Sequence, residues 1–152
     1  MFTMNRLACL AFALYFFCCL SPAIAACNSQ MAKKAEEQAS TLKTWSALHQ
    51  SFKRYAACDD GAIAEGYSNS VATLLADWSD VVSLNRMVTK DKKFGDFVIK
   101  HIDWLMTPSQ LESIDSQAGK SCPTEATALC GRIRERVSEI RSSAEQASPG
   151  KQ

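Results

Sequence analysis

The stretch CDDGAIAEGYSNSVATLLADW, from Cys58 to Trp78, predicts the helix around which the rest of the chain folds. Its acidic pair, Asp59 and Asp60, carries oxygens that can accept from the free amide groups at the start of a helix. Gly66 costs about 1 kcal/mol relative to alanine inside a helix, which indicates close approach by another helix, either at this position or through Ala62. Apolar side chains recur at helical spacing, at Ile63, Tyr67, Val71, Leu74, Leu75 and Trp78.

Helical spacing on both sides of this stretch predicts an all-α fold of five or six helices with short connections. No segment alternates with period two for long enough to form a strand. The sharpest boundary is Thr107-Pro108-Ser109-Gln110, which combines a threonine cap, a proline at the first helical position and a glutamine placed for a capping box. The expected helices lie at residues 41–57, 61–77, 81–88, 94–105, 107–118 and 122–141.

The two ends of the chain differ from this helical domain, which we place at residues 41–141. Residues 1–25 combine a basic start, an unbroken apolar run from Leu7 to Leu20 and the small-residue site Ala23-Ile24-Ala25, a pattern typical of an export signal peptide. Residues 26–40 are helix-prone but offer little to bury, so we expect a flexible lead-in. Residues 142–152 are small and polar, which predicts a disordered tail.

Charge is balanced once the signal is removed. Arg6 is the one charged residue before Lys33, so of the 17 basic and 16 acidic side chains the remainder keeps 16 of each. This balance argues against a nucleic-acid partner and against an acidic solvating tail. The length after the signal suits one domain with a real hydrophobic core.

Four cysteines follow the signal, namely Cys27, Cys58, Cys122 and Cys130, an even set that suits two disulfides in an oxidising compartment. If Cys122 caps the last helix, Cys130 lies about 12 Å further along it, beyond the reach of a bridge. We then expect Cys58 to pair with Cys130, and Cys27 with Cys122. If instead the two residues after Cys122 form a turn, the pair Cys122 and Cys130 becomes feasible.

Cys27 also fits a second interpretation, because Ile24-Ala25-Ala26 before it matches the small-residue box that precedes the lipid-modified cysteine of bacterial lipoproteins. Lipidation would leave one of the other three thiols without a partner. We therefore favour soluble export to the periplasm or the medium. No membrane association is expected unless Cys27 is lipidated.

Carboxylates gather at the two ends of the predicted central helix, and they are the candidate partner-binding residues. Helix capping also explains them. An enzymatic reading would have to use some of these carboxylates with His101, but the chain has no HExxH, CxxCH, GxSxG or Gly-rich phosphate motif. We therefore assign no catalytic residue, metal ligand or cofactor. The candidate carboxylates are Asp59, Asp60, Glu65, Asp77 and Asp80.

The aromatic side chains fall on or next to the helical apolar rows, and we interpret them as core or as walls of a groove. An aromatic-lined cavity for a small ligand between the helices is the alternative. These residues are Trp45, Tyr55, Tyr67, Trp78 and Trp104.

Three blocks carry a resemblance: Tyr55 to Ser68, Phe97 to Ile102, and Cys122 to Cys130. In these blocks the chain is similar to a group of small exported helical proteobacterial proteins of uncharacterised function. More loosely, it resembles the helical, cysteine-bridged immunity proteins that neutralise cell-wall amidase effectors of type VI secretion by plugging the enzyme cleft. The resemblance implies a helical periplasmic protein, and it transfers no functional residue.

The sequence therefore predicts a non-enzymatic periplasmic binding protein with a protein partner, and an immunity-type inhibitor of a cell-wall-degrading effector is the sharpest form of this hypothesis. One alternative is a carrier of a small apolar ligand in an interhelical cavity. The other is a lipoprotein with a structural or assembly role.

Overall fold

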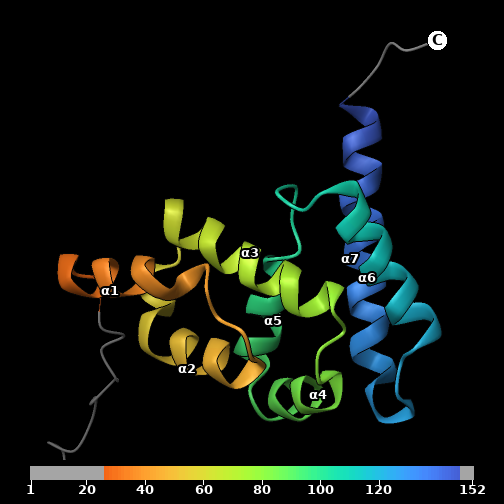
Figure 1. The fold of residues 1–152 in the computed structure, drawn as a ribbon, viewed down its shortest axis with the longest axis horizontal. Helices are drawn as coiled ribbons and strands as arrows, with labels where there is room; N and C mark the ends of the chain where they lie inside the picture. The colour runs from red at the N-terminus through yellow and green to blue at the C-terminus, as the bar shows by residue number, and fades with distance from the viewer. Residues whose placement is uncertain (1–25, 148–152) are drawn as a thin grey trace, which may run out of the picture.

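The computed structural model describes residues 26–147, and every regular element in this part of the chain is helical (Figure 1). The predicted all-α class is thus confirmed, with seven α-helices in the described residues rather than five or six. The expected signal peptide, residues 1–25, lies outside the described residues. The elements are α1 (Ser29–Ala39), α2 (Trp45–Tyr55), η1 (Ala56–Cys58), α3 (Gly61–Ala76), α4 (Val81–Lys90), α5 (Lys92–Lys100), α6 (Pro108–Lys120), η2 (Thr124–Ala126) and α7 (Thr127–Gln146).

Helix α3 lies at the centre of the fold, as its sequence predicts. The Asp60 side chain accepts from the backbone N–H of Gly61 and fixes the start of the helix. Nine of the 16 residues of α3 are buried, because it packs against α1 and α2 and also against α6. Tyr67 and Val71, both fully buried, lie on its core-facing side.

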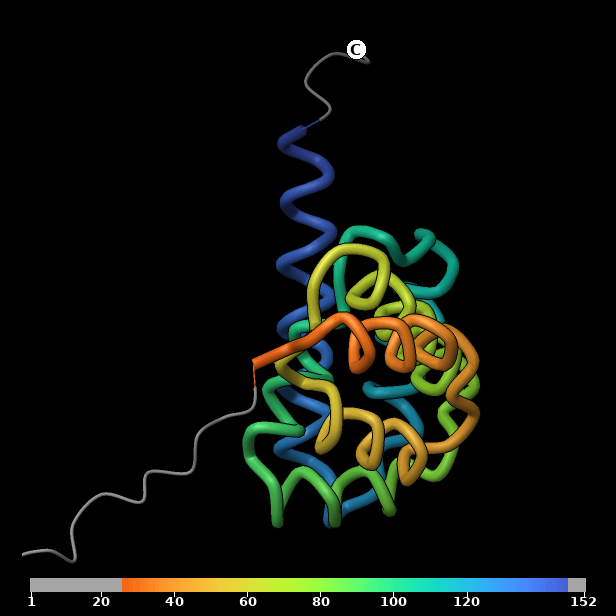
Figure 2. Tube along the Cα trace, turned by 90° about the vertical axis from the view of Figure 1, so that its left-hand side faces the viewer, coloured from red at the N-terminus to blue at the C-terminus, as the bar shows by residue number. Residues whose placement is uncertain are grey.

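Two further helix pairs complete the molecule. Helices α6 and α7 lie side by side as an antiparallel pair at one end of the body (Figure 1), joined on their outer face by an ion pair between Arg134 and Asp115 at 3.1 Å. Helices α4 and α5 form the second pair, separated by Asp91 alone, which caps α5. Figure 2 shows that the last turns of α7 project beyond the rest of the fold.

The segment expected to be a flexible lead-in is an ordered helix, so that expectation was wrong. Asn28 caps α1, and Ala35 and Ala39 are fully buried against the rest of the fold. A small buried surface suffices because Gly66 of α3 has no side chain and lets α1 approach closely. A disulfide at Cys27 holds the start of the helix.

The expected boundary of the tail was also wrong. Helix α7 continues with exposed side chains to Gln146, several residues past the boundary predicted at residue 142. The last five residues of the expected tail, 148–152, lie outside the described residues. None of the described helices has the length and apolarity needed to cross a bilayer.

Two disulfides are present, but their pairing corrects the first expectation. Cys27 pairs with Cys58, and Cys122 pairs with Cys130, so the expected pairs Cys58 to Cys130 and Cys27 to Cys122 were wrong. The alternative arrangement holds for the second bridge. A 3-10 turn follows Pro123 and α7 begins later, which leaves the Cα atoms of Cys122 and Cys130 6.2 Å apart.

The helix expected over residues 94–105 ends earlier, at Lys100. The chain then forms a loop before the capping box of α6, which is present as predicted at Thr107 and Gln110. We call residues 102–107 the Trp104 loop. Figure 1 shows it standing out from the body between α5 and α6.

Candidate functional site

A network of polar side chains lies where α5 ends, against α3 and η1. His101 is 1% exposed, and its Nδ1 atom lies 2.9 Å from the Ser68 hydroxyl. Its Nε2 atom lies 3.2 Å from Asp59 Oδ2 and 3.1 Å from Asp59 Oδ1. The Lys100 ammonium reaches Asp59 Oδ2 at 2.7 Å, and Ser68 donates to Asp103 Oδ2 at 2.6 Å. The network thus joins residues 59–68 to residues 100–103, with sequence separations of 33 to 42 between the bonded residues.

The direction of each hydrogen bond follows from the donors available. A carboxylate only accepts, so the Ser68 hydroxyl donates its proton to Asp103. Its oxygen then accepts from Nδ1–H of His101, while Nε2–H donates to Asp59. The imidazole ring thus lies between Asp59, which Nε2 contacts directly, and Ser68, which bonds onward to Asp103.

The pKa of the Asp59 carboxyl reflects its burial and its contacts in this network. Its side chain is 9% exposed, and burial alone would raise the pKa of the carboxyl. The hydrogen bonds and positive charges of His101 and Lys100 outweigh burial and lower the pKa of Asp59 below its ordinary value of 3.8. The ionised carboxylate is thus the form that the fold stabilises.

The order Ser68, His101, Asp59 has the connectivity of a catalytic triad, but the surroundings argue for a structural role. Ser68 is 2% exposed and gives its proton to Asp103 rather than to the histidine. It also lies inside α3, where neighbouring backbone amides bond along the helix and leave no donors for an oxyanion. We interpret the network as the support of the Trp104 loop.

The Trp104 loop is held at both ends. Asp103 receives the Ser68 bond on one oxygen, and its other oxygen accepts from the Leu105 backbone N–H at 3.0 Å. Ile102 is fully buried, and its carbonyl accepts from the Arg136 guanidinium at 2.9 Å. Met106 is 5% exposed and packs into the core. The tip of the loop, and Thr107 at its end, are left exposed to water.

That tip carries Trp104, 78% exposed, and Leu105, 40% exposed, which are the large exposed hydrophobic side chains of the described residues. The interpretation of Trp104 as core or groove wall was therefore wrong. Apolar spacing continues past the end of α5, but the Asp103 turn rotates the following side chains outward. Trp45 and Tyr67 are buried as expected, and Trp78 is partly buried.

The predicted acidic residues do not form one site. Asp59 belongs to the buried network, and Asp60 caps α3. Asp77 and Asp80 lie at the other end of α3, where Asp80 caps α4 through the Ser83 backbone. Glu65 is exposed and lines a small hollow beside the Trp104 loop. Their role in partner binding stays a prediction.

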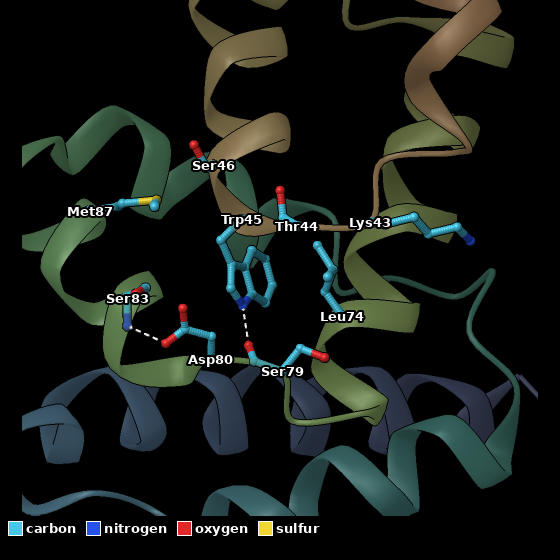
Figure 3. Close-up of a pocket in the computed structure, with 9 residues that line it drawn as sticks. All are labelled: Lys43, Thr44, Trp45, Ser46, Leu74, Ser79, Asp80, Ser83 and Met87. Carbon is cyan, nitrogen blue, oxygen red and sulfur yellow. Dashed lines mark hydrogen bonds between the residues drawn. The ribbon is translucent and has the colours of Figure 1, made fainter.

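Figure 3 shows a second hollow, of about 200 Å³, between the start of α2 and the turn before α4. The Trp45 indole N–H donates to the Ser79 carbonyl at its floor. Trp78 and Asp80 have φ values of 50° and 40°, a backbone region that a bulky residue rarely adopts. The Trp78 indole bonds to the Ser121 carbonyl at 3.1 Å and helps to hold this turn. Ligand pockets are generally larger, about 300 to 1,000 Å³, so this hollow adds no support for a carrier.

His49, the second histidine, is partly buried and lies 2.9 Å from Asp91, away from the His101 network. Among residues 26–147 no three side chains of the metal-ligating types are arranged to hold an ion.

Comparison of the chain with protein families, with curated proteins and with solved structures finds no match.

Proposed function

We propose that this protein is a non-enzymatic, exported binding protein whose Trp104 loop inserts into a concave site on a partner protein. The observation that carries the proposal is the setting of Trp104. Its indole is 78% exposed, although the residues around it are fixed by buried contacts and hydrogen bonds. Trp104 thus has the features of an interface anchor.

Physical chemistry favours this use of the loop. Tryptophan is enriched among the residues that dominate interface energies, where truncation costs about 2 kcal/mol or more. A loop that is already ordered loses little conformational entropy on binding. Because the tip is convex, it fits a cleft or pocket better than a flat surface.

In its most specific form, the proposal is that the protein inhibits a partner enzyme. A rigid protruding loop that fills an enzyme cleft excludes the substrate without chemistry of its own. The two disulfides favour an oxidising compartment. An immunity-type inhibitor of a cell-wall-degrading effector combines these features with the resemblance noted in the sequence.

The lipoprotein alternative conflicts with the bridge at Cys27. A sulfur that forms a disulfide with Cys58 cannot also carry a lipid thioether. Intact mass of the exported protein tests this point, since the bridged form lacks the mass of a lipid.

The test of the proposal is affinity capture from an extract of exported proteins, with the disulfide-bonded protein as bait. We expect a protein partner at fixed stoichiometry, which is then purified and titrated calorimetrically. Trp104→Ala should weaken this binding about 30-fold, which corresponds to roughly 2 kcal/mol. Lys33→Ala, an exposed change on α1, should leave the affinity unchanged.

Two results would contradict the proposal. One is the recovery of no stoichiometric partner by the unaltered protein. The other is an equal affinity of the Trp104→Ala and Lys33→Ala variants for the partner that is recovered. For the inhibitor form, the purified partner must be an enzyme whose activity the unaltered protein blocks at equimolar amounts.

A further inference from the structure

A group of unpaired cations lies where α2 meets the junction of α4 and α5. We call this group the basic face, and all of its side chains are exposed. Within the described residues none of them lies within 4 Å of a carboxylate, since the ion pairs there involve other residues. The members of the basic face are Lys53, Arg86, Lys90, Lys92 and Lys93.

The fold brings these residues together through the contact of His49 with Asp91. Their side chains lie 2.9 Å apart, which draws α2 onto the α4–α5 junction. Lys53 lies one helical turn beyond His49 on α2. Three lysines flank Asp91 in the sequence, and Arg86 lies one turn before the first of them, Lys90. Cations from three helices therefore share one end of the molecule.

Nearby carboxylates offset only part of this positive charge. Asp91 is partly buried, and the hydrogen bond with His49 lowers its pKa despite burial. Asp96 is paired with Arg132 at 2.8 Å. Asp80 caps the opposite end of α4, where hydrogen bonds from Ser83 and the charge of Arg86 lower its pKa, so Asp80 offsets part of the charge of Arg86. Residues 26–152 carry equal numbers of basic and acidic side chains, but folding separates some of them.

The chemistry of the basic face does not resemble a protein or nucleic-acid interface. Protein interfaces are depleted in lysine and centred on buried aromatic or apolar anchors. Four of the five cations here are lysines, and the large exposed hydrophobic side chains, Trp104 and Leu105, lie at the far end of α5. The face also has no exposed aromatic side chain on which bases could stack. Compact, mobile charges of this kind suit a diffuse anionic surface.

We propose that the basic face binds the surface of a bilayer that contains anionic phospholipid. The sequence alone predicts no such contact without a lipid on Cys27, because its charges balance. In both Figure 1 and Figure 2, α4 and the α5–α6 connection lie at opposite ends of the molecule. A protein bound through the basic face thus directs the Trp104 loop away from the membrane.

Sedimentation with vesicles tests this proposal on the purified, disulfide-bonded protein. We expect binding to vesicles of phosphatidylcholine with phosphatidylglycerol, and at least tenfold weaker binding to phosphatidylcholine alone. Added salt should weaken the binding, because the charges are exposed and screened. The double variant Lys90→Glu with Lys93→Glu should lose at least tenfold in affinity, and so should Lys53→Glu with Lys92→Glu.

The matched control is Lys33→Glu with Lys34→Glu, which changes the net charge by the same amount on α1, where Glu36 and Glu37 follow. Its affinity should stay within twofold of the unaltered protein. Equal losses in the control and basic-face variants would overturn the proposal, and so would the absence of binding. Equally tight binding to soluble heparin would overturn the assignment to lipid. Trp104→Ala should keep vesicle binding, so this test is independent of the proposed partner.

Discussion

At Gly66 the backbones of α1 and α3 approach so closely that a side chain does not fit. A Cβ atom there would lie 2.8 Å from the Ala39 Cβ and 3.0 Å from the Ser40 backbone nitrogen. Because backbone moves less readily than a flexible side chain, Gly66→Ala should force α1 away from α3. We expect a loss of about 1 to 3 kcal/mol in the free energy of unfolding, measured by urea denaturation.

Gly131 provides the matched control for this prediction. It lies inside α7, and a Cβ atom there meets nothing within 4 Å. Gly131→Ala should raise the free energy of unfolding by about 0.5 to 1 kcal/mol, because alanine favours the helix. A stabilising effect at both positions would show that α1 does not pack on α3 as described. The close approach at Gly66 was predicted from the sequence and is confirmed.

The helices themselves were largely predictable, and their ends less so. The α6 start was found because Thr107 and Gln110 form a local signal that needs no tertiary contact. The α5 end was missed because apolar spacing continues through Leu105, while the turn depends on Asp103 bonding to Ser68 of another helix. Where a boundary depends on distant residues, local periodicity misplaces it.

Helix α1 depends on the Cys27–Cys58 bridge more than the other helices do. Ala35 and Ala39 anchor the later turns of α1 in the core, while the bridge between residues 31 positions apart ties the start of the helix to η1. By the chain-entropy model, Cys27→Ser with Cys58→Ser should lower the free energy of unfolding by about 3.7 kcal/mol. Hydrogen exchange should accelerate first at the α1 amides.

The second bridge serves as the comparison. It joins cysteines only eight positions apart in the sequence, Cys122 and Cys130, and replacing both by serine should lower the free energy of unfolding by about 2.5 kcal/mol. Faster exchange should then appear at the start of α7 and not in α1. If both pairs of substitutions accelerate hydrogen exchange at the α1 amides equally, the Cys27–Cys58 bridge has no special role in holding α1.

At the scale of the whole molecule, the sequence predicted which types of residue matter but not which residues contact each other. Asp59 was a candidate partner-binding residue and His101 entered only in the enzymatic reading, yet their contact depends on how α5 packs near η1. The Cys122–Cys130 pair depends on the 3-10 turn before α7, and the basic face depends on the contact of α2 with the α4–α5 junction. Pairing over long sequence distances follows from packing, which periodicity does not encode.

The contact of Asp59 with His101 links the N-terminal segments to the Trp104 loop, so its titration should affect the stability of the whole fold. The pKa of Asp59 lies below its ordinary value of 3.8 in the folded state. Between those two values the unfolded chain binds more protons than the folded one. The contribution of Asp59 is therefore fully present well above pH 3.8 and is lost as the pH falls through the folded pKa.

Asp59→Asn isolates this contribution from those of other carboxyl groups. At neutral pH the variant should be less stable, because it leaves His101 and Lys100 beside a neutral amide. Its disadvantage in the free energy of unfolding should shrink as the pH falls below about 4, measured by urea denaturation from pH 7 to pH 3. Asp60→Asn, which keeps a capping side chain, should follow the unaltered protein across this range. A disadvantage of Asp59→Asn that stays constant from pH 7 to pH 3 would show that the folded state does not stabilise the ionised Asp59.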